Sequence, residues 1–92
     1  MTAFVYCAWF QDQMLPPDDQ DHEWPACFIV EADTADEALV WGDHLAKSYS
    51  TRTPEEVFLR SAVEDAETAE GDLASLPVVA AGYEATDADI GW

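Results

Sequence analysis

The stretch that decides the fold is PACFIVEADTADEALVWGDHLAKSYS, residues 25 to 50. Its first part, Ala26 to Val30, is an unbroken apolar run, which is typical of a strand with both faces at least partly covered. Its second part carries apolar residues at the spacing of an α-helix. Because the connection between the two parts is short, we expect the helix to pack back on the strand and cover one face of a sheet.

A capping sequence marks the start of this helix. Thr34 is a good N-cap residue and Glu37 follows three positions later, so T-A-D-E can form a capping box in which a hydroxyl and a carboxylate each accept a hydrogen bond from a backbone N–H. Asp36 and Glu37 also place negative charge in the first turn, where the helix dipole favours it. The helix is therefore predicted to begin just after Thr34.

One face of the predicted helix is apolar. Its residues recur at spacings of three and four and are Ala38, Leu39, Gly42, Leu45, Ala46 and Tyr49. Asp36 and Asp43 are predicted to lie on the opposite side. Gly42 in mid-helix costs about 1 kcal/mol relative to alanine, which indicates a close approach of helix and sheet at that position. Trp41 is interpreted as an aromatic residue of the core or its rim.

Two more segments flank this unit. Residues 3 to 10, AFVYCAWF, are predicted to form a first strand. Residues 76 to 83 are a candidate fourth strand, at an edge of the sheet because Pro77 has no N–H for a ladder. Residues 11 to 25 contain Pro16, Pro17 and Pro25 and show no regular period, so they are predicted to form a long acidic loop.

Residues 55 to 70 fit two descriptions. Thr53 to Glu56, T-P-E-E, is a good helix start, and apolar residues at helical spacing follow it. The alternation over residues 57 to 64 equally fits a strand with one mixed and one more apolar face. We favour the strand, because two strands and a helix make too small a sheet to be stable and a third strand would complete it.

These elements predict a single α+β domain over residues 1 to 92. Its core is a small antiparallel or mixed sheet of three to four strands with one amphipathic helix packed on one face, in the order β-β-α-β-β. A chain of 92 residues is long enough for one hydrophobic core but not for two. The domain carries the acidic loop at residues 11–25 and a second acidic segment at residues 64–72.

The two cysteines, Cys7 and Cys27, each lie inside an apolar run. We interpret them as reduced, buried thiols in preference to a disulfide that joins neighbouring strands. The geometry that a bridge would need is not readable from sequence.

Charge is the feature that points toward function. The chain has 20 acidic and 3 basic residues, a formal net charge of −17, yet 49% of its residues are hydrophobic, so it is expected to fold. Such a charge repels nucleic acid and anionic membranes, so a macromolecular partner is expected to be basic. The first residues lack a basic leader and their apolar run stops at Gln11, which predicts neither a signal peptide nor a membrane span. We therefore expect a cytoplasmic protein.

Motifs for metal binding or catalysis are absent from the sequence. Asp19, Asp21 and Glu23 alternate as in a calcium loop, but the glycine and the final glutamate of that loop are missing. Cys7, Cys27, His22 and His44 include the ligand types for zinc without its spacing. His44 follows Asp43 directly, and neighbours on a helix do not face each other. We expect a protein without catalytic residues, metal or cofactor.

The acidic runs suggest imitation of a polyanion. Carboxylates two apart on a strand are separated by about 6.6 Å, and those three or four apart on a helix by about 5 to 6 Å, of the order of the spacing of successive phosphates. Such a row is suited to occupy a basic DNA- or RNA-binding channel. The candidate contact residues are Asp12, Asp18, Asp19, Asp21, Glu23, Glu64, Asp65, Glu67, Glu70 and Asp72.

The predicted function is thus a non-catalytic inhibitor of a basic nucleic-acid-binding protein or nuclease. In size and charge alone, the chain is similar to the small acidic inhibitors that phages direct at host defence nucleases, including anti-restriction and anti-CRISPR proteins. No motif carries this similarity, and it assigns no family. The alternatives are an immunity protein against a basic toxin nuclease and a small cytosolic domain whose acidity is an adaptation to a high-salt cytoplasm.

Overall fold

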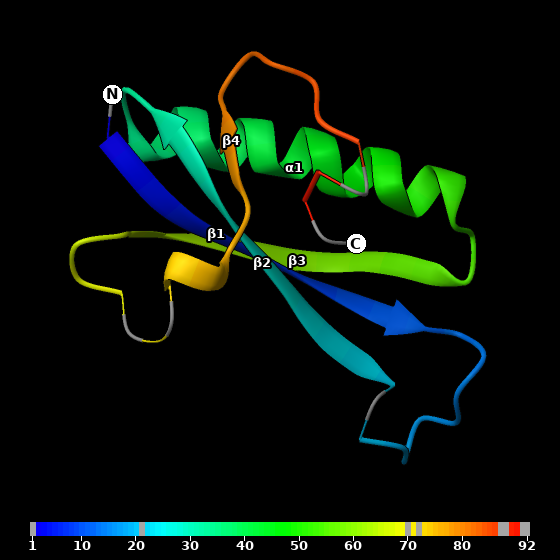
Figure 1. The fold of residues 1–92 in the computed structure, drawn as a ribbon. Helices are drawn as coiled ribbons and strands as arrows, with labels where there is room; N and C mark the ends of the chain where they lie inside the picture. Colours follow the sequence, from blue (N-terminus) through cyan, green and yellow to red (C-terminus); the bar gives the residue numbers. More distant parts are fainter. Residues whose placement is uncertain (1, 21, 70, 72, 87–88, 91–92) are drawn as a thin grey trace.

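The computed structural model describes residues 2–20, 22–69, 71, 73–86 and 89–90, which form a four-stranded mixed sheet with one long helix packed on it (Figure 1). The elements are β1 (Thr2–Asp12), β2 (Glu23–Ala32), α1 (Ala35–Arg52), β3 (Glu56–Asp65), the 3-10 turn η1 (Leu73–Ser75) and β4 (Val78–Ala80). The strand order is β3-β1-β2-β4, with β1 antiparallel to β2 and β3, and β4 parallel to β2. The predicted α+β class and β-β-α-β-β order are confirmed.

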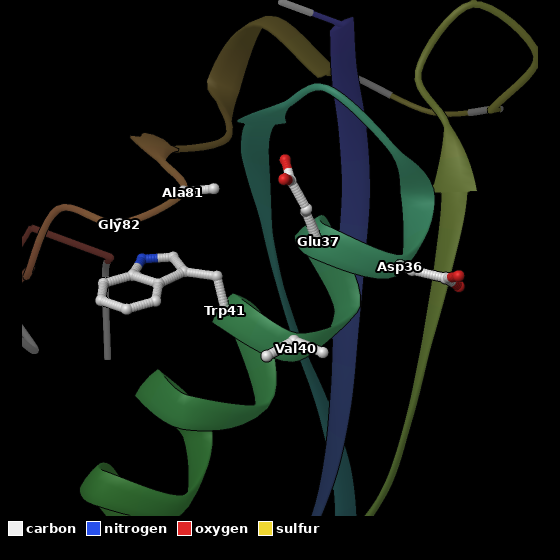
Figure 2. A pocket seen from close by; sticks show the side chains of 6 residues that line it. All are labelled: Asp36, Glu37, Val40, Trp41, Ala81 and Gly82. Atoms are coloured by element: carbon white, nitrogen blue, oxygen red, sulfur yellow. The ribbon is translucent and has the colours of Figure 1, made fainter.

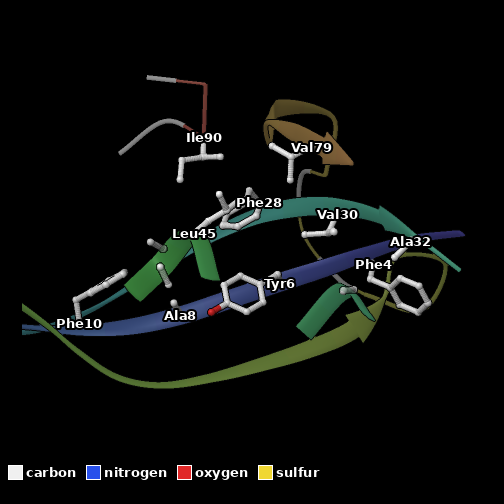
Figure 3. Close-up of a cluster of buried hydrophobic side chains, with 13 residues drawn as sticks. Phe4, Tyr6, Ala8, Phe10, Phe28, Val30, Ala32, Leu45, Val79 and Ile90 are labelled. Atoms are coloured by element: carbon white, nitrogen blue, oxygen red, sulfur yellow. The ribbon is translucent and has the colours of Figure 1, made fainter. Parts of the chain in front are cut away.

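The core lies between the sheet and α1. Even-numbered residues of β1 and β2 point to the helix side, because successive strand residues face opposite ways. Tyr6, Phe10, Phe28 and Val30 are fully buried there (Figure 3). Ile90 packs in the same layer and is only 2% exposed. No helix in the described part of the chain is long and apolar enough to cross a membrane.

The helix begins as predicted. Thr34 has an extended backbone, and its hydroxyl accepts a hydrogen bond of 3.1 Å from the Glu37 N–H. The Glu37 carboxylate reaches back one residue further than in a standard capping box and accepts from the Asp33 N–H at 3.2 Å. The predicted apolar stripe is also confirmed: four members are buried and two pack against the core, namely Ala38, Gly42, Leu45 and Ala46, then Leu39 and Tyr49.

Helix and sheet meet most closely at Gly42. A Cβ atom at this position would overlap the ring of Tyr6 on β1. The close approach predicted from the mid-helix glycine is therefore confirmed, with an aromatic ring as the facing group.

Asp43 does not lie on the solvent side of α1, and that prediction was wrong. Its Oδ1 accepts hydrogen bonds from the Tyr6 hydroxyl at 2.7 Å and the Ser61 hydroxyl at 2.5 Å. Helix α1 packs on both β1 and β3, so Asp43, next to Gly42, reaches a hydroxyl on each strand. The polar partners come from other elements, which the helical pattern alone does not reveal.

The choice of a strand for residues 55 to 70 is confirmed by β3. The predicted strand at residues 76 to 83 is shorter than expected, because only Val78–Ala80 pair with β2. It is an edge strand as predicted, and Pro77 precedes it and accepts a hydrogen bond of 2.8 Å from the Ile29 N–H.

The connection from β3 to β4 joins opposite edges of the sheet. Val5 and Ile29 point away from the helix side and are nevertheless only 7% and 8% exposed. The described part of this connection, residues 66–69, 71 and 73–77 with η1, therefore covers this end of the second face, and Figure 1 shows η1 across the strands from α1. The strand residues near the other end of that face, such as Trp9, are less buried.

The long loop predicted at residues 11–25 is shorter in the structure. Gln11 and Asp12 belong to β1, and residues 23 to 25 belong to β2, so the connection is a hairpin loop at 13–22. The sequence prediction missed these strand ends because both strands extend past the core, where their residues show little apolar alternation. Trp24 fixes the start of β2 to the start of β3, since its indole N–H donates to the Glu56 carboxylate at 2.6 Å.

The interpretation of the cysteines as free thiols was wrong. Cys7 and Cys27 form a disulfide, with Cα atoms 4.2 Å apart. The hairpin register places them directly opposite each other on the face away from α1, where both are half-buried. Register depends on which residues the two strands bury, so the pairing follows from the packed hairpin and not from the spacing of the cysteines.

Candidate binding surface

The two acidic runs singled out in the sequence lie at opposite ends of the sheet. The hairpin acids follow the end of β1, where Gln11 pairs with Glu23, whereas Asp65 pairs with Phe4 near its start. An 11-residue strand spans about 33 Å, so the two runs do not form one patch (Figure 1). Of the predicted contact residues, Asp21, Glu70 and Asp72 fall outside the described residues.

The run after β3 is joined by acids that the sequence reading did not select. The end of β2, the turn after it and the first turn of α1 all lie at the same end of the molecule as the end of β3. We call this group the acidic end, and its members, all exposed, are Glu31, Asp33, Asp36, Glu37, Glu64, Asp65 and Glu67. The sequence carried no local signal for this grouping, which arises because β2 and β3 both run antiparallel to β1 and so end at the same level on either side of it.

The chain's three basic side chains all lie in the other half. Arg60 lies over the Trp9 ring at 5.2 Å and contacts Glu23 at 3.3 Å. Lys47 lies 5.8 Å from the Phe58 ring, and Arg52 is in the last turn of α1. Arg60 lies four residues before Glu64 on β3, which is about 13 Å along the strand. That distance exceeds the Debye length of about 8 Å at physiological salt, so the acidic end keeps its negative field.

Carboxylates elsewhere are more often engaged by side chains. Glu23 pairs with Arg60 in the hairpin half, and Glu84 contacts the His44 ring at 2.6 Å. Asp12 accepts from the Met14 N–H at 2.9 Å and so helps to shape the hairpin loop. The acidic end differs in that the bonds to its carboxylates come from backbone N–H groups, as at Glu37 and Asp65.

A groove of about 430 Å³ adjoins the acidic end (Figure 2). It lies between the first turns of α1 and the chain that leaves β4, where Gly82 adopts a φ of 89°. Its lining residues are Asp36, Glu37, Val40, Trp41, Ala81 and Gly82. Trp41 is held in place because its indole N–H donates to the Tyr83 carbonyl at 3.1 Å and its ring stacks on His44. Val40 is 69% exposed.

Other polar groups in the described residues show no arrangement typical of catalysis. The pKa of Tyr6 is raised by burial and by its hydrogen bond to Asp43, so the phenol stays protonated and serves as a donor. Among residues that the structure describes, no three histidine, cysteine, aspartate or glutamate side chains are grouped to hold a metal ion.

The chain matches no protein-family model, and no curated protein or solved structure is significantly similar to it.

Proposed function

We propose that this protein is a non-catalytic acidic binding protein that inhibits a basic nucleic-acid-binding partner by presenting its acidic end in place of DNA or RNA. One observation supports the proposal above the others. The exposed carboxylates of the acidic end are gathered at one end of a folded domain, while the chain's three basic side chains lie in the other half. The basic side chains partly offset the acids of the hairpin half, as Arg60 does for Glu23, so the negative field is least compensated at the acidic end.

The physical basis is competition for the same cations. Lysines and arginines that line a nucleic-acid channel bind phosphates by charge-assisted hydrogen bonds, and carboxylates accept from the same donors. The acidic end carries its carboxylates on strand ends and a helix start, so their positions are set by the scaffold. Electrostatic attraction would accelerate association and would weaken as salt is added.

The same surface chemistry serves an immunity protein that neutralises a basic toxin nuclease, and the identity of the partner separates the two roles. The proposal places the protein in the cytoplasm, where nucleic-acid-binding partners are abundant. Disulfides are rare in that compartment, so the redox state of Cys7 and Cys27 in cells tests the location. The proposal assigns the contact to the acidic end alone, and Asp18 and Asp19 in the hairpin loop lie far from it, so they serve as the comparison surface.

The test of the proposal uses a mixture of DNA-binding proteins, obtained from a cell lysate by elution from immobilised DNA. The immobilised acidic protein should retain members of this mixture, and excess DNA or added salt should release them. A retained protein, once purified, should lose binding to a fluorescent DNA duplex as the acidic protein is added. If retention persists in excess DNA, the partner is not bound through its nucleic-acid site and the proposal fails.

Matched variants locate the contact surface. The double variant Glu31→Gln, Glu64→Gln removes two charges from the acidic end, whereas Asp18→Asn, Glu55→Gln removes two from the opposite end. The first should weaken inhibition by about three- to tenfold, in line with two exposed ion pairs of up to about 1 kcal/mol each. The second should change it little. Equal loss in both would mean that net charge alone, and not the acidic end, governs binding.

A further inference from the structure

We propose that the groove beside Trp41 is an anchor pocket for an arginine side chain of the binding partner. The inference rests on the proposed function for the identity of that partner, but the chemistry of the groove can be tested without it. The groove combines an indole ring, an exposed valine and two carboxylates, and no lysine or arginine lines it among the described residues. This composition is complementary to a side chain with an apolar stem and a cationic head.

The indole of Trp41 is preorganised for stacking. Its N–H is bound to the Tyr83 carbonyl, so the ring does not need to be fixed when a ligand arrives. His44, one turn further along α1, stacks on it with ring centres 4.7 Å apart. Glu37 is one turn earlier, so the groove approaches Trp41 from the side away from His44. A guanidinium placed there would gain a cation–π contact with the face of the ring.

The carboxylates supply the charge. Glu37 and Trp41 are four residues apart and therefore lie next to each other on the helix surface, as Figure 2 shows. The Glu37 carboxylate already accepts one bond from the Asp33 N–H, yet a carboxylate can accept about four. Asp36 also lines the groove, and although its carboxylate points away from Trp41 in Figure 2, it adds to the negative field there. The chain's three lysine and arginine side chains all lie in the other half of the molecule.

Arginine fits these groups better than lysine does. Its planar guanidinium stacks on aromatic rings and forms paired hydrogen bonds with a carboxylate, and it is more weakly hydrated than an ammonium group. The stem can lie along Val40, which is 69% exposed and lines the groove with Trp41. Anionic ligands such as nucleotides are disfavoured by both carboxylates. Arginine is also enriched among the residues that dominate binding at protein interfaces.

The test uses the whole protein labelled with ¹⁵N and three short peptides, Ac-Gly-Arg-Gly-NH₂ and its lysine and citrulline counterparts. The arginine peptide should shift the Trp41 indole and Glu37 amide resonances in a saturable way. The lysine peptide should shift them less, and the uncharged citrulline peptide should have little effect. Shifts of equal size at Asp18 and Trp41 would show general attraction to a negative protein and would overturn the pocket.

Two variants and one control assign the contacts. Glu37→Gln should weaken binding of the arginine peptide by about threefold, as expected for one exposed ion pair. Trp41→Leu should also weaken it about threefold through the lost cation–π contact, with circular dichroism to show that the domain is folded. Asp18→Asn, which removes the same charge at the far end, should leave it unchanged. Unchanged affinity in Glu37→Gln contradicts the proposal even if the Trp41 variant does not fold.

The outcomes also separate this inference from the proposed function. Saturable arginine binding at Trp41 without any displacement of DNA from a basic protein would leave an arginine pocket on a protein with another role. DNA displacement that is weakened by Glu31→Gln, Glu64→Gln but unaffected by Trp41→Leu would support the acidic end and refute the anchor.

Discussion

The buried Tyr6 hydroxyl donates a 2.7 Å hydrogen bond to Asp43 Oδ1, and so ties the central strand β1 to the middle of α1. Ser61 on β3 donates to the same oxygen. One carboxylate therefore joins three elements at the point where Gly42 lets the helix approach the sheet. The helix that carries Glu37 and Trp41 is positioned by this contact.

The first prediction concerns alkaline pH. The pKa of Tyr6 is raised above its ordinary value of 10.0, mainly by burial and to a smaller extent by the hydrogen bond to Asp43. The folded state thus holds the phenol proton more tightly than the unfolded state, so the contribution of Tyr6 to stability is complete below pH 10 and is lost as pH rises above it. The free energy of unfolding should fall by about 1.4 kcal/mol per pH unit from this group.

Urea unfolding between pH 8 and about pH 11 measures this slope against two variants. Tyr6→Phe should lower stability by about 1 to 2 kcal/mol at neutral pH, because the hydrogen bond is lost, and should flatten the alkaline decline. Tyr83→Phe, at a side chain that is 69% exposed, should do neither. An unchanged slope in Tyr6→Phe would show that Tyr6 does not control the alkaline transition.

The second prediction concerns Gly42. In an exposed helix, a change from glycine to alanine stabilises by about 1 kcal/mol. Here Gly42→Ala should destabilise by about 1 to 3 kcal/mol, because the new methyl group meets the Tyr6 ring and forces helix and sheet apart. Chemical denaturation gives the sign. A stabilised variant would mean that α1 lies further from β1 than described.

The third prediction concerns the disulfide. Cys7 and Cys27 close a loop with a sequence separation of 20, and a cross-link of that size stabilises by about 3 kcal/mol. Reduction should lower the free energy of unfolding by up to this amount, and the Cys7→Ala, Cys27→Ala variant should be insensitive to reductant. Thiol labelling of the unreduced, denatured protein should find no free thiol. Full labelling would exclude the bridge.

The fourth prediction concerns salt. At low ionic strength the acidic end repels itself, and raising salt from about 0.01 to 0.15 M shortens the Debye length from about 30 to 8 Å. The midpoint of thermal unfolding should rise over this range and then level off. Glu31→Gln, Glu64→Gln should start from a higher midpoint and respond less to salt. A fold that appears only in molar salt would instead favour adaptation to a high-salt cytoplasm.

Local features of the chain were predictable where neighbouring residues supply the physical cause. The cap at Thr34, the apolar stripe of α1 and the close approach at Gly42 each follow from groups within a few positions of each other. The strand at residues 56 to 65 was predictable from the same alternation, once the need for a third strand was considered. The total charge was known from composition alone.

The binding surface was only partly predictable, because carboxylates that are close in sequence were not those that are close in space. Glu64, Asp65 and Glu67 were selected from their run, but Glu31, Asp33, Asp36 and Glu37 join them only because β2 and β3 end at the same level on either side of β1. The groove beside Trp41 needed one more step, since its far wall comes from residues 81 and 82.

Composition and short-range pattern thus set the charge, the helix and the strand identities, because these depend on residues that are neighbours along the chain. The Cys7–Cys27 bridge, the bond from Tyr6 to Asp43 and the grouping of carboxylates at the acidic end depended on register and on the crossing of the sheet. Those relationships join residues far apart in the chain, and only the packing of the whole core brings them within reach of each other.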